Sequence, residues 1–194
     1  MRAWSRQLLI VVAVVVLASS SAPRPGAGAF ADPGVQGDPF ERQIGRMLVS
    51  GVGGEGYGTS AGAIKIYGYE WNASFQSGTG KSLAQPFVVT KRIDKATPIL
   101  LRRLTGGVHI PTVKVELTKT DSTSAGPWVY MRYCLGDVII TRLQDADLGT
   151  PSDVPVEDIS FTFRRIVEEY WETRTATKVI QGHDFALNIA TTTC

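Results

Sequence analysis

The stretch that decides the fold runs from Lys91 to Thr120 and is KRIDKATPILLRRLTGGVHIPTVKVELTKT. It predicts a strand, a short helix and a second strand. Thr97 is the expected N-cap, because its hydroxyl can accept a hydrogen bond from an unpaired backbone N–H. Pro98 suits the first helical position, where its missing N–H costs nothing. Gly106 and Gly107 should end the helix, since glycine accepts the left-handed conformation of a C-terminal cap.

The predicted helix has one apolar face, made by Leu100, Leu101 and Leu104 at helical spacing. Arg102 and Arg103 stand in its last turn, where positive charge suits the negative end of the helix dipole. Two helical turns are not stable alone in water, so the leucines must pack on the flanking strands. We therefore expect Leu101 and Leu104 to be buried and Arg103 to be exposed.

The composition is that of a folded protein with many strands. The 194 residues are 43% hydrophobic and 20% charged, which fits one ordinary domain and excludes a disordered chain. The 20 glycines and 10 prolines, together with many Val, Ile, Thr and Tyr residues, indicate short strands separated by frequent turns.

Residues 1–29 have the pattern of a secretory signal peptide. Arg2 and Arg6 precede the apolar run Leu8–Ala18, which is too short to span a bilayer as a helix. Ala27-Gly28-Ala29 fits the cleavage pattern, and Ala22, which precedes a proline, is a weaker second candidate. An uncleaved membrane anchor is the alternative. We expect cleavage and a secreted or periplasmic protein with no stable membrane anchor.

Cleavage would also change the charge balance. It would remove three of the 20 basic residues and none of the 18 acidic ones, which leaves 17 basic against 18 acidic residues. Nucleic-acid binding needs a concentrated basic face, so we expect no nucleic-acid partner. Residues 30–43, with scattered glycines, prolines and charges, predict an extended linker. Residues 44–194 are then the folded domain.

Cys134 and Cys194 both lie in that domain. An exported protein can keep disulfides, so the two can form an internal bridge, an intermolecular bridge or two free thiols. Cys134 lies in a predicted strand, where a free cysteine packs as a small apolar residue. Cys194 ends the chain, where order is usually low. Sequence alone does not set the distance between them.

Alternating residue types predict strands along the whole domain. The clearest alternation is Ile159, Phe161 and Phe163 with polar residues between them. Gly68 predicts a bulge or a close backbone approach. Gln76–Gln85 and Gln144–Pro155 are expected to be loops. The other expected strands are Ile44–Ser50, Ala63–Phe75, Phe87–Arg92, Val113–Leu117, Trp128–Leu135, Asp137–Leu143, Val167–Trp171 and Lys178–Ala190.

Many strands with one convincing helix predict a mostly β fold, a closed or sandwiched β-barrel, which also removes exposed strand edges. Five short runs, in order, resemble the haemolysin-coregulated protein (Hcp) family, which forms the inner tube of type VI secretion systems. They are Val52 with Gly54-Glu55, Tyr69-Glu70-Trp71, Arg92-Ile93-Asp94-Lys95 with Thr97-Pro98 and Gly107-Val108-His109, Glu157-Asp158-Ile159-Ser160-Phe161, and Gly182 with Asp184 and Asn188.

The resemblance implies a β-barrel of two antiparallel sheets with one short flanking helix. It also implies hexameric rings that can stack into a tube and hold cargo proteins in the lumen. This chain departs from the family pattern in three ways. It has a predicted signal peptide, an extra linker, and His183 where the family has a tryptophan. It therefore resembles an exported variant of the tube protein.

No motif predicts a catalytic, cofactor-binding or metal-binding residue. Gly51, Gly53 and Gly56 match G-x-G-x-x-G but open no helix, so we interpret them as a turn. The run Gly80-Lys81-Ser82 lacks the earlier glycine of a phosphate-binding loop. His109 is interpreted as a structural histidine bonded to backbone.

His183 is the only other histidine, and neither it nor His109 has metal-ligand spacing. Glu168, Glu169 and Glu172 are expected to form a solvated face rather than a carboxylate pair.

The leading hypothesis is a structural protein that forms rings and tubes by head-to-tail contacts. The two long loops, Gln76–Gln85 and Gln144–Pro155, are candidates for contacts between subunits. The alternative is an exported binding module that holds a ligand or a cargo protein without forming a tube. An enzyme is the third hypothesis, and nothing in the sequence favours it.

Overall fold

The computed structural model describes residues 42–56, 61–122, 126–146 and 155–194. The predicted signal peptide and nearly all of the predicted linker lie outside these residues. The elements are β1 (Gly45–Val49), β2 (Ile64–Ile66), β3 (Gly68–Glu70), β4 (Ala73–Gln76), β5 (Lys81–Ala84), β6 (Phe87–Arg92), α1 (Thr97–Thr105), β7 (Ile110–Lys119), β8 (Trp128–Ala146), β9 (Val156–Tyr170), β10 (Val179–Asp184) and β11 (Ile189–Ala190).

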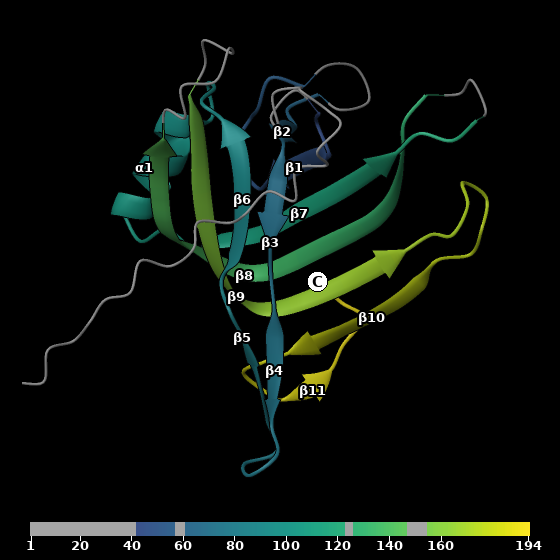
Figure 1. The fold of residues 1–194 in the computed structure, drawn as a ribbon. Coiled ribbons are helices and arrows are strands. Elements are labelled where there is room, and N and C mark those ends of the chain that lie inside the picture. The colour runs from purple at the N-terminus through teal and green to yellow at the C-terminus, as the bar shows by residue number, and fades with distance from the viewer. Residues whose placement is uncertain (1–41, 57–60, 123–125, 147–154) are drawn as a thin grey trace, which may run out of the picture. The chain divides into compact units, whose positions relative to one another are not determined.

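Nine strands form one antiparallel sheet, whose main path runs β11-β10-β9-β8-β7-β1-β2. The long strands β8 and β9 lie side by side at its centre (Figure 1). On the other side of β9, its first residues, Val156–Phe161, pair with β6, and its last, Arg165–Tyr170, pair with β10. The sheet therefore forks at β9, and β6 carries β3 on its far edge.

The mostly β class with one short helix is confirmed, but the closed barrel is wrong. Among the described strands, β2, β3 and β11 each pair with a single neighbour, so no ladder closes the sheet. The physical reason lies in Ala63–Phe75, expected as one strand but broken into β2, β3 and β4. A Cβ on Gly68, at the break, would lie 3.3 Å from the Thr90 hydroxyl, so a side chain, rather than the predicted second backbone, lies close to this glycine.

The core lies on one face of the large sheet. Val113, Val115 and Leu117 of β7 are buried, as their alternation predicts, and Ile159 and Phe161 of β9 join them. The predicted break of β8 at Gly136 is not a strand end. The strand continues through a kink at Asp137, whose φ is +57°, where the ladders to both neighbours skip a residue.

Helix α1 is docked by a different face from the predicted one. Leu100 is fully buried and Leu104 packs against the core, but Leu101 is 48% exposed, so its predicted burial is wrong. The row that faces the core is Ala96, Leu100 and the half-buried Leu104, one residue every four, which places Leu101 on the flank. At the far end Gly107 adopts the left-handed conformation, with φ of +57°.

The predicted N-cap is also wrong. The helix begins at Thr97, and the residue in the cap position is Ala96, which offers no side-chain hydrogen bond. Asp94 builds the entry turn instead, because its carboxylate accepts from the Ala96 N–H at 2.9 Å and its carbonyl accepts from the Thr97 N–H at 3.0 Å. The Thr97 hydroxyl is thereby free to point towards β9.

The predicted loop Gln76–Gln85 is mostly a β-hairpin. Strands β4 and β5 pair from Ala73 opposite Ala84 to Gln76 opposite Lys81, and form a separate two-stranded sheet. Asn188, in the turn between β10 and β11, holds this hairpin. Its amide donates to the Gly80 carbonyl at 3.1 Å and accepts from the Ser82 N–H at 3.2 Å. The hairpin is therefore held near its turn.

Of the three alternatives for the cysteines, the structure has the internal bridge. Cys134 of β8 is bonded to Cys194, with 5.7 Å between their Cα atoms. The C-terminal residue crosses Gly136, where an added Cβ would lie 3.1 Å from the Cys194 carbonyl carbon. The absence of a side chain at Gly136 thus leaves room for the chain end.

Candidate functional site

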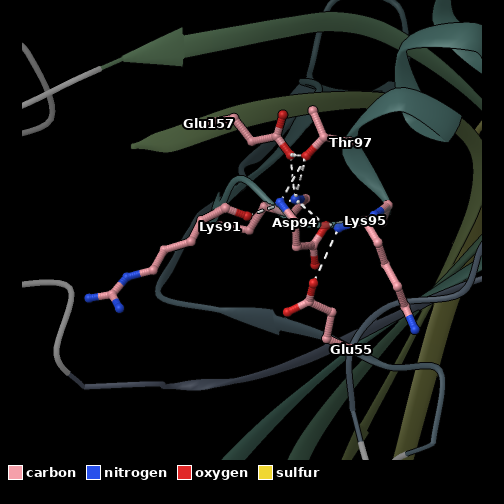
Figure 2. A network of polar contacts seen from close by, with 8 residues as sticks. Glu55, Lys91, Asp94, Lys95, Thr97 and Glu157 are labelled. Carbon is pink, nitrogen blue, oxygen red and sulfur yellow. Dashed lines mark hydrogen bonds and ion pairs between the residues drawn. The ribbon is translucent and has the colours of Figure 1, made fainter. Parts of the chain in front are cut away.

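The corner where β6 enters α1 contains a buried network of Lys91, Asp94, Thr97 and Glu157 (Figure 2). Lys91 and Glu157 lie directly opposite each other on β6 and β9. They form an ion pair, and both side chains are 0% exposed. Each occupies an inward position in an apolar alternation, Lys91 after Phe87 and Val89, and Glu157 before Ile159 and Phe161.

Thr97 links the other members of the buried network, in which Glu157 Oε2 has no hydrogen-bond partner among the described residues. Its hydroxyl donates to Glu157 Oε1 at 2.7 Å and accepts from the Asp94 N–H at 3.2 Å and from Lys91 Nζ at 3.1 Å. A hydroxyl offers one donor and two acceptor sites, so Thr97 uses all of them. Lys91 Nζ also donates to Asp94 Oδ1 and to the Arg92 carbonyl, each at 2.8 Å.

The buried network joins three elements and leaves no room for chemistry. It fixes the first turn of α1 to β6 and β9, and Glu55 adds an outer contact by accepting from the Lys95 N–H at 3.4 Å. A substrate could not reach Lys91 or Glu157, because both are fully covered by protein. We conclude that these residues position the helix.

A second ionic system, the charge ladder, crosses the other end of the large sheet. It consists of Arg46, Glu116, Arg132 and Glu169, which lie opposite one another on β1, β7, β8 and β9, and of Lys178 before β10. The successive contacts are 2.6 Å from Arg46 to Glu116, 2.7 Å from Glu116 to Arg132 and 2.7 Å from Arg132 to Glu169. Lys178 pairs with Glu169.

The acidic and basic members of the ladder differ in exposure. Glu116 and Glu169 are buried, whereas the side chains of Arg132 and Lys178 are 30% and 41% exposed. Burial alone would raise the pKa of Glu169, but hydrogen bonds from Lys178 and Arg132 hold that pKa below its usual value. The expected solvated face is therefore wrong for Glu169 and holds for Glu172, which is exposed.

Two exposed apolar surfaces are candidates for contacts between subunits. One is the outer side of α1, which exposes Ile99 on one flank and Leu101 on the other. Ile99, Arg102 and Arg103 line a hollow of about 630 Å³ there. The other is the hairpin, where Phe75 is 66% exposed and Leu83 is 41% exposed. Of the other predicted contact loop, Gln144–Pro155, Gln144–Ala146 belong to β8 and 147–154 lie outside the described residues.

The residues that resemble parts of catalytic or binding motifs have structural contacts in this fold. His109 is exposed, and its Nδ1 lies 2.9 Å from Asp137 Oδ1, so the expected backbone partner is wrong. The glycine-rich motif starts with a turn in which the Val52 N–H donates to the Val49 carbonyl, and the next described element is β2. Gly80-Lys81-Ser82 lies in the hairpin.

Within the described ranges, no three His, Cys, Asp or Glu residues are placed to hold a metal ion. In the same part of the chain, no helix has the length and apolar character needed to cross a membrane.

The comparisons with known proteins agree on one protein family. The family described as "Type VI secretion system effector, Hcp" matches residues 47–170. The "Major exported protein" of Pseudomonas aeruginosa is 35% identical over 98 residues, which are 47% of this chain and 56% of that relative. The match thus spans little more than half of the curated relative.

Two solved structures share the fold over nearly their whole length. A type VI secretion system effector from Yersinia pestis is 26% identical with a TM-score of 0.60, over 72% of this chain and 98% of that one. Hcp1 from Salmonella typhimurium is 22% identical with a TM-score of 0.64, over 75% and 97% respectively.

The contacts of the buried network and of the charge ladder were not predicted from the sequence. Lys91 and Glu157 carried a visible signal, because each places a charge at an inward position of an apolar alternation. Glu116 carried no such signal, since it stands on the face that alternation assigns to water. Which strand lies beside which decides these pairs, and that information is not local.

Proposed function

The chain belongs to the Hcp family of type VI secretion proteins, and on that premise we propose that it is a tube subunit that assembles into closed rings. The observation that carries the proposal is the family match over residues 47–170, which includes the buried network and all of α1. We assign six subunits to the ring and allow rings to stack, as the family resemblance implies. The role is assembly rather than catalysis.

The exposed apolar surfaces support contacts between unlike faces. The outer side of α1 exposes Ile99 and Leu101, and the β4–β5 hairpin exposes Phe75 and Leu83, so both elements offer apolar side chains that an assembly would cover. Contacts between unlike surfaces form a ring where the rotation closes and extend as a stack where it does not. We assign the outer side of α1 to the contact within a ring and the hairpin to the contact between rings.

We further propose that the ring works outside the cytoplasm, after cleavage behind Ala29. The Cys134–Cys194 bridge supports this, because disulfides persist in oxidising compartments and are rare in the cytosol. Intact-mass measurement of the extracytoplasmic protein tests it. We expect the mass of a chain that begins at Phe30. A cytoplasmic product that retains Met1 would contradict the proposal.

Light scattering across micromolar concentrations tests the ring itself. We expect the mass of a closed oligomer for the unchanged protein, and smaller species for Leu101→Asp, which puts a charge on the outer side of α1. Val179→Asp is the matched control, because Val179 is also exposed but lies on β10. A monomer for the unchanged protein would reject the ring and favour the binding module.

A further inference from the structure

A pocket of about 430 Å³ lies between the β9–β10 part of the large sheet and the β4–β5 hairpin. Its floor comes from residues that share the core face of the sheet. Ile166 and Glu168 of β9 stand opposite His183 and Gln181 of β10, and on their other side opposite Leu135 and Tyr133 of β8. The walls include Trp71, Phe75 and Phe185.

Glu168 breaks the pattern of this floor. Ile166 before it is buried, as are Leu135 and Tyr133 across the ladder, so an apolar residue would be expected. The Glu168 carboxyl forms no ion pair or hydrogen bond with any other described residue, and burial raises its pKa. A local departure from the folding pattern without compensation is typical of a functional position.

The walls are aromatic, and two of their polar atoms lack partners. Trp71 and Phe185 each lie against Phe163, with ring centroids 6.5 and 5.9 Å apart, and His183 packs edge-on against Phe185 at 4.9 Å. Trp71 Nε1 and His183 Nε2 are buried and have no hydrogen-bond partner in the described part of the chain. Both nitrogens are covered by protein, so a bound group would contact the faces and edges of these rings rather than the nitrogens.

We propose that this pocket binds an arginine or lysine side chain presented on an extended peptide segment of a partner protein. The cation would compensate the lone Glu168 carboxyl and lie against the aromatic walls, an arrangement that attracts cations.

The chain makes the same kind of contact elsewhere. Arg132 and Lys178 lie over the Trp171 ring at 5.2 and 5.8 Å from its centroid, and both also pair with Glu169. The pocket offers a partner the same combination of carboxylate and ring. This inference goes beyond the proposed function and does not depend on ring formation.

Calorimetric titration of the protein with its disulfide intact tests the inference. The probes are acetyl-Gly-Arg-Gly-amide and the same peptide with citrulline, which keeps the shape of arginine without its charge. We expect saturable binding of the arginine peptide at least about tenfold tighter than of the citrulline peptide, because hydrogen bonds to charged groups are the stronger ones. The indole N–H resonance of Trp71 should shift on binding.

Glu168→Gln should abolish the preference for arginine, whereas Glu172→Gln, an exposed matched control, should keep it. Phe75→Ala, in the exposed hairpin, should weaken the binding of both peptides. Equal affinity of the two peptides for the unchanged protein, no saturable binding of the arginine peptide, or a preference that survives Glu168→Gln would overturn the proposal. Equal affinity for agmatine and the arginine peptide would overturn the assignment to a protein segment.

Discussion

The buried network and the charge ladder join strands by the same kind of contact but in opposite surroundings. Lys91 and Glu157 have no access to solvent, and a single threonine hydroxyl uses all its hydrogen-bonding capacity within their network. In the ladder, the arginine and lysine side chains keep part of their surface in water. The first arrangement fixes the entry of a helix, and the second crosses an open sheet face.

This difference in solvent exposure decides how much each ionic system contributes to the stability of the fold. A charge stripped of water depends wholly on its partner, so losing one member of a buried pair is costly. A charge that keeps water can fall back on hydration, and exposed ion pairs contribute little. We therefore expect the fold to tolerate changes in the ladder and not in the buried network.

The largest expected effect comes from Lys91→Met. The substitution keeps the volume but leaves Glu157 buried without a cation, and should reduce the free energy of unfolding by about 3 to 5 kcal/mol. Urea unfolding measures it. The double change Lys91→Met with Glu157→Met should recover at least half of the loss. A double variant as unstable as the sum of both single ones would show that the pair is not the unit that matters.

Leu100→Ala should cost about 2 to 5 kcal/mol, because it opens a cavity where α1 packs on the core. The matched control is Leu101→Ala, which should change stability by less than about 0.5 kcal/mol, since that side chain is half exposed. Both are measured by urea unfolding. Similar losses for the two leucines would mean that the helix is docked by another face.

Removing the disulfide with Cys194→Ser should cost about 2 to 4 kcal/mol, mainly by freeing the unfolded chain. The comparison is between the oxidised protein and the variant in thermal unfolding. Treatment with a reductant should bring the unchanged protein to the melting temperature of the variant and leave the variant unaffected. An unchanged melting temperature after verified reduction would contradict the bridge as a stabilising contact.

The smallest effects concern two neighbouring carboxyls with opposite pKa shifts. The lowered pKa of Glu169 means that it stabilises the fold above its unfolded pKa of about 4.3, and that this is lost as pH falls through its folded pKa. Glu169→Gln should thus cost up to about 1 kcal/mol at pH 7, with the loss shrinking in acid and in salt.

Glu168→Gln should slightly stabilise the protein at pH 7. Burial raises the pKa of Glu168, so its ionised form opposes folding above its unfolded pKa. Unfolding measured between pH 3 and 7 gives both slopes. If the stability change caused by each substitution varied with pH in the same direction, the opposite pKa shifts of Glu168 and Glu169 would be contradicted.

The sequence predicted features that local chemistry decides. Leu100 and the glycine stop marked the helix, and the inward rows of β7 and β9 followed their alternation. It failed where distant strands choose partners. The predicted burial of Leu101 was wrong because the core contacts a different row of helix residues, Ala96, Leu100 and Leu104. The barrel was wrong because the chain breaks near Gly68, and the bridge to Cys194 depended on a distance that only the fold sets.

Electron microscopy of the oxidised, exported protein tests the central claim most directly. Class averages viewed along the particle axis should show a closed ring with an open centre, made of identical subunits. Stacked rings at higher concentration would fit the same account. Particles of single-subunit size at micromolar concentration, with Cys134 and Cys194 bridged, would contradict it and leave a monomeric binding module.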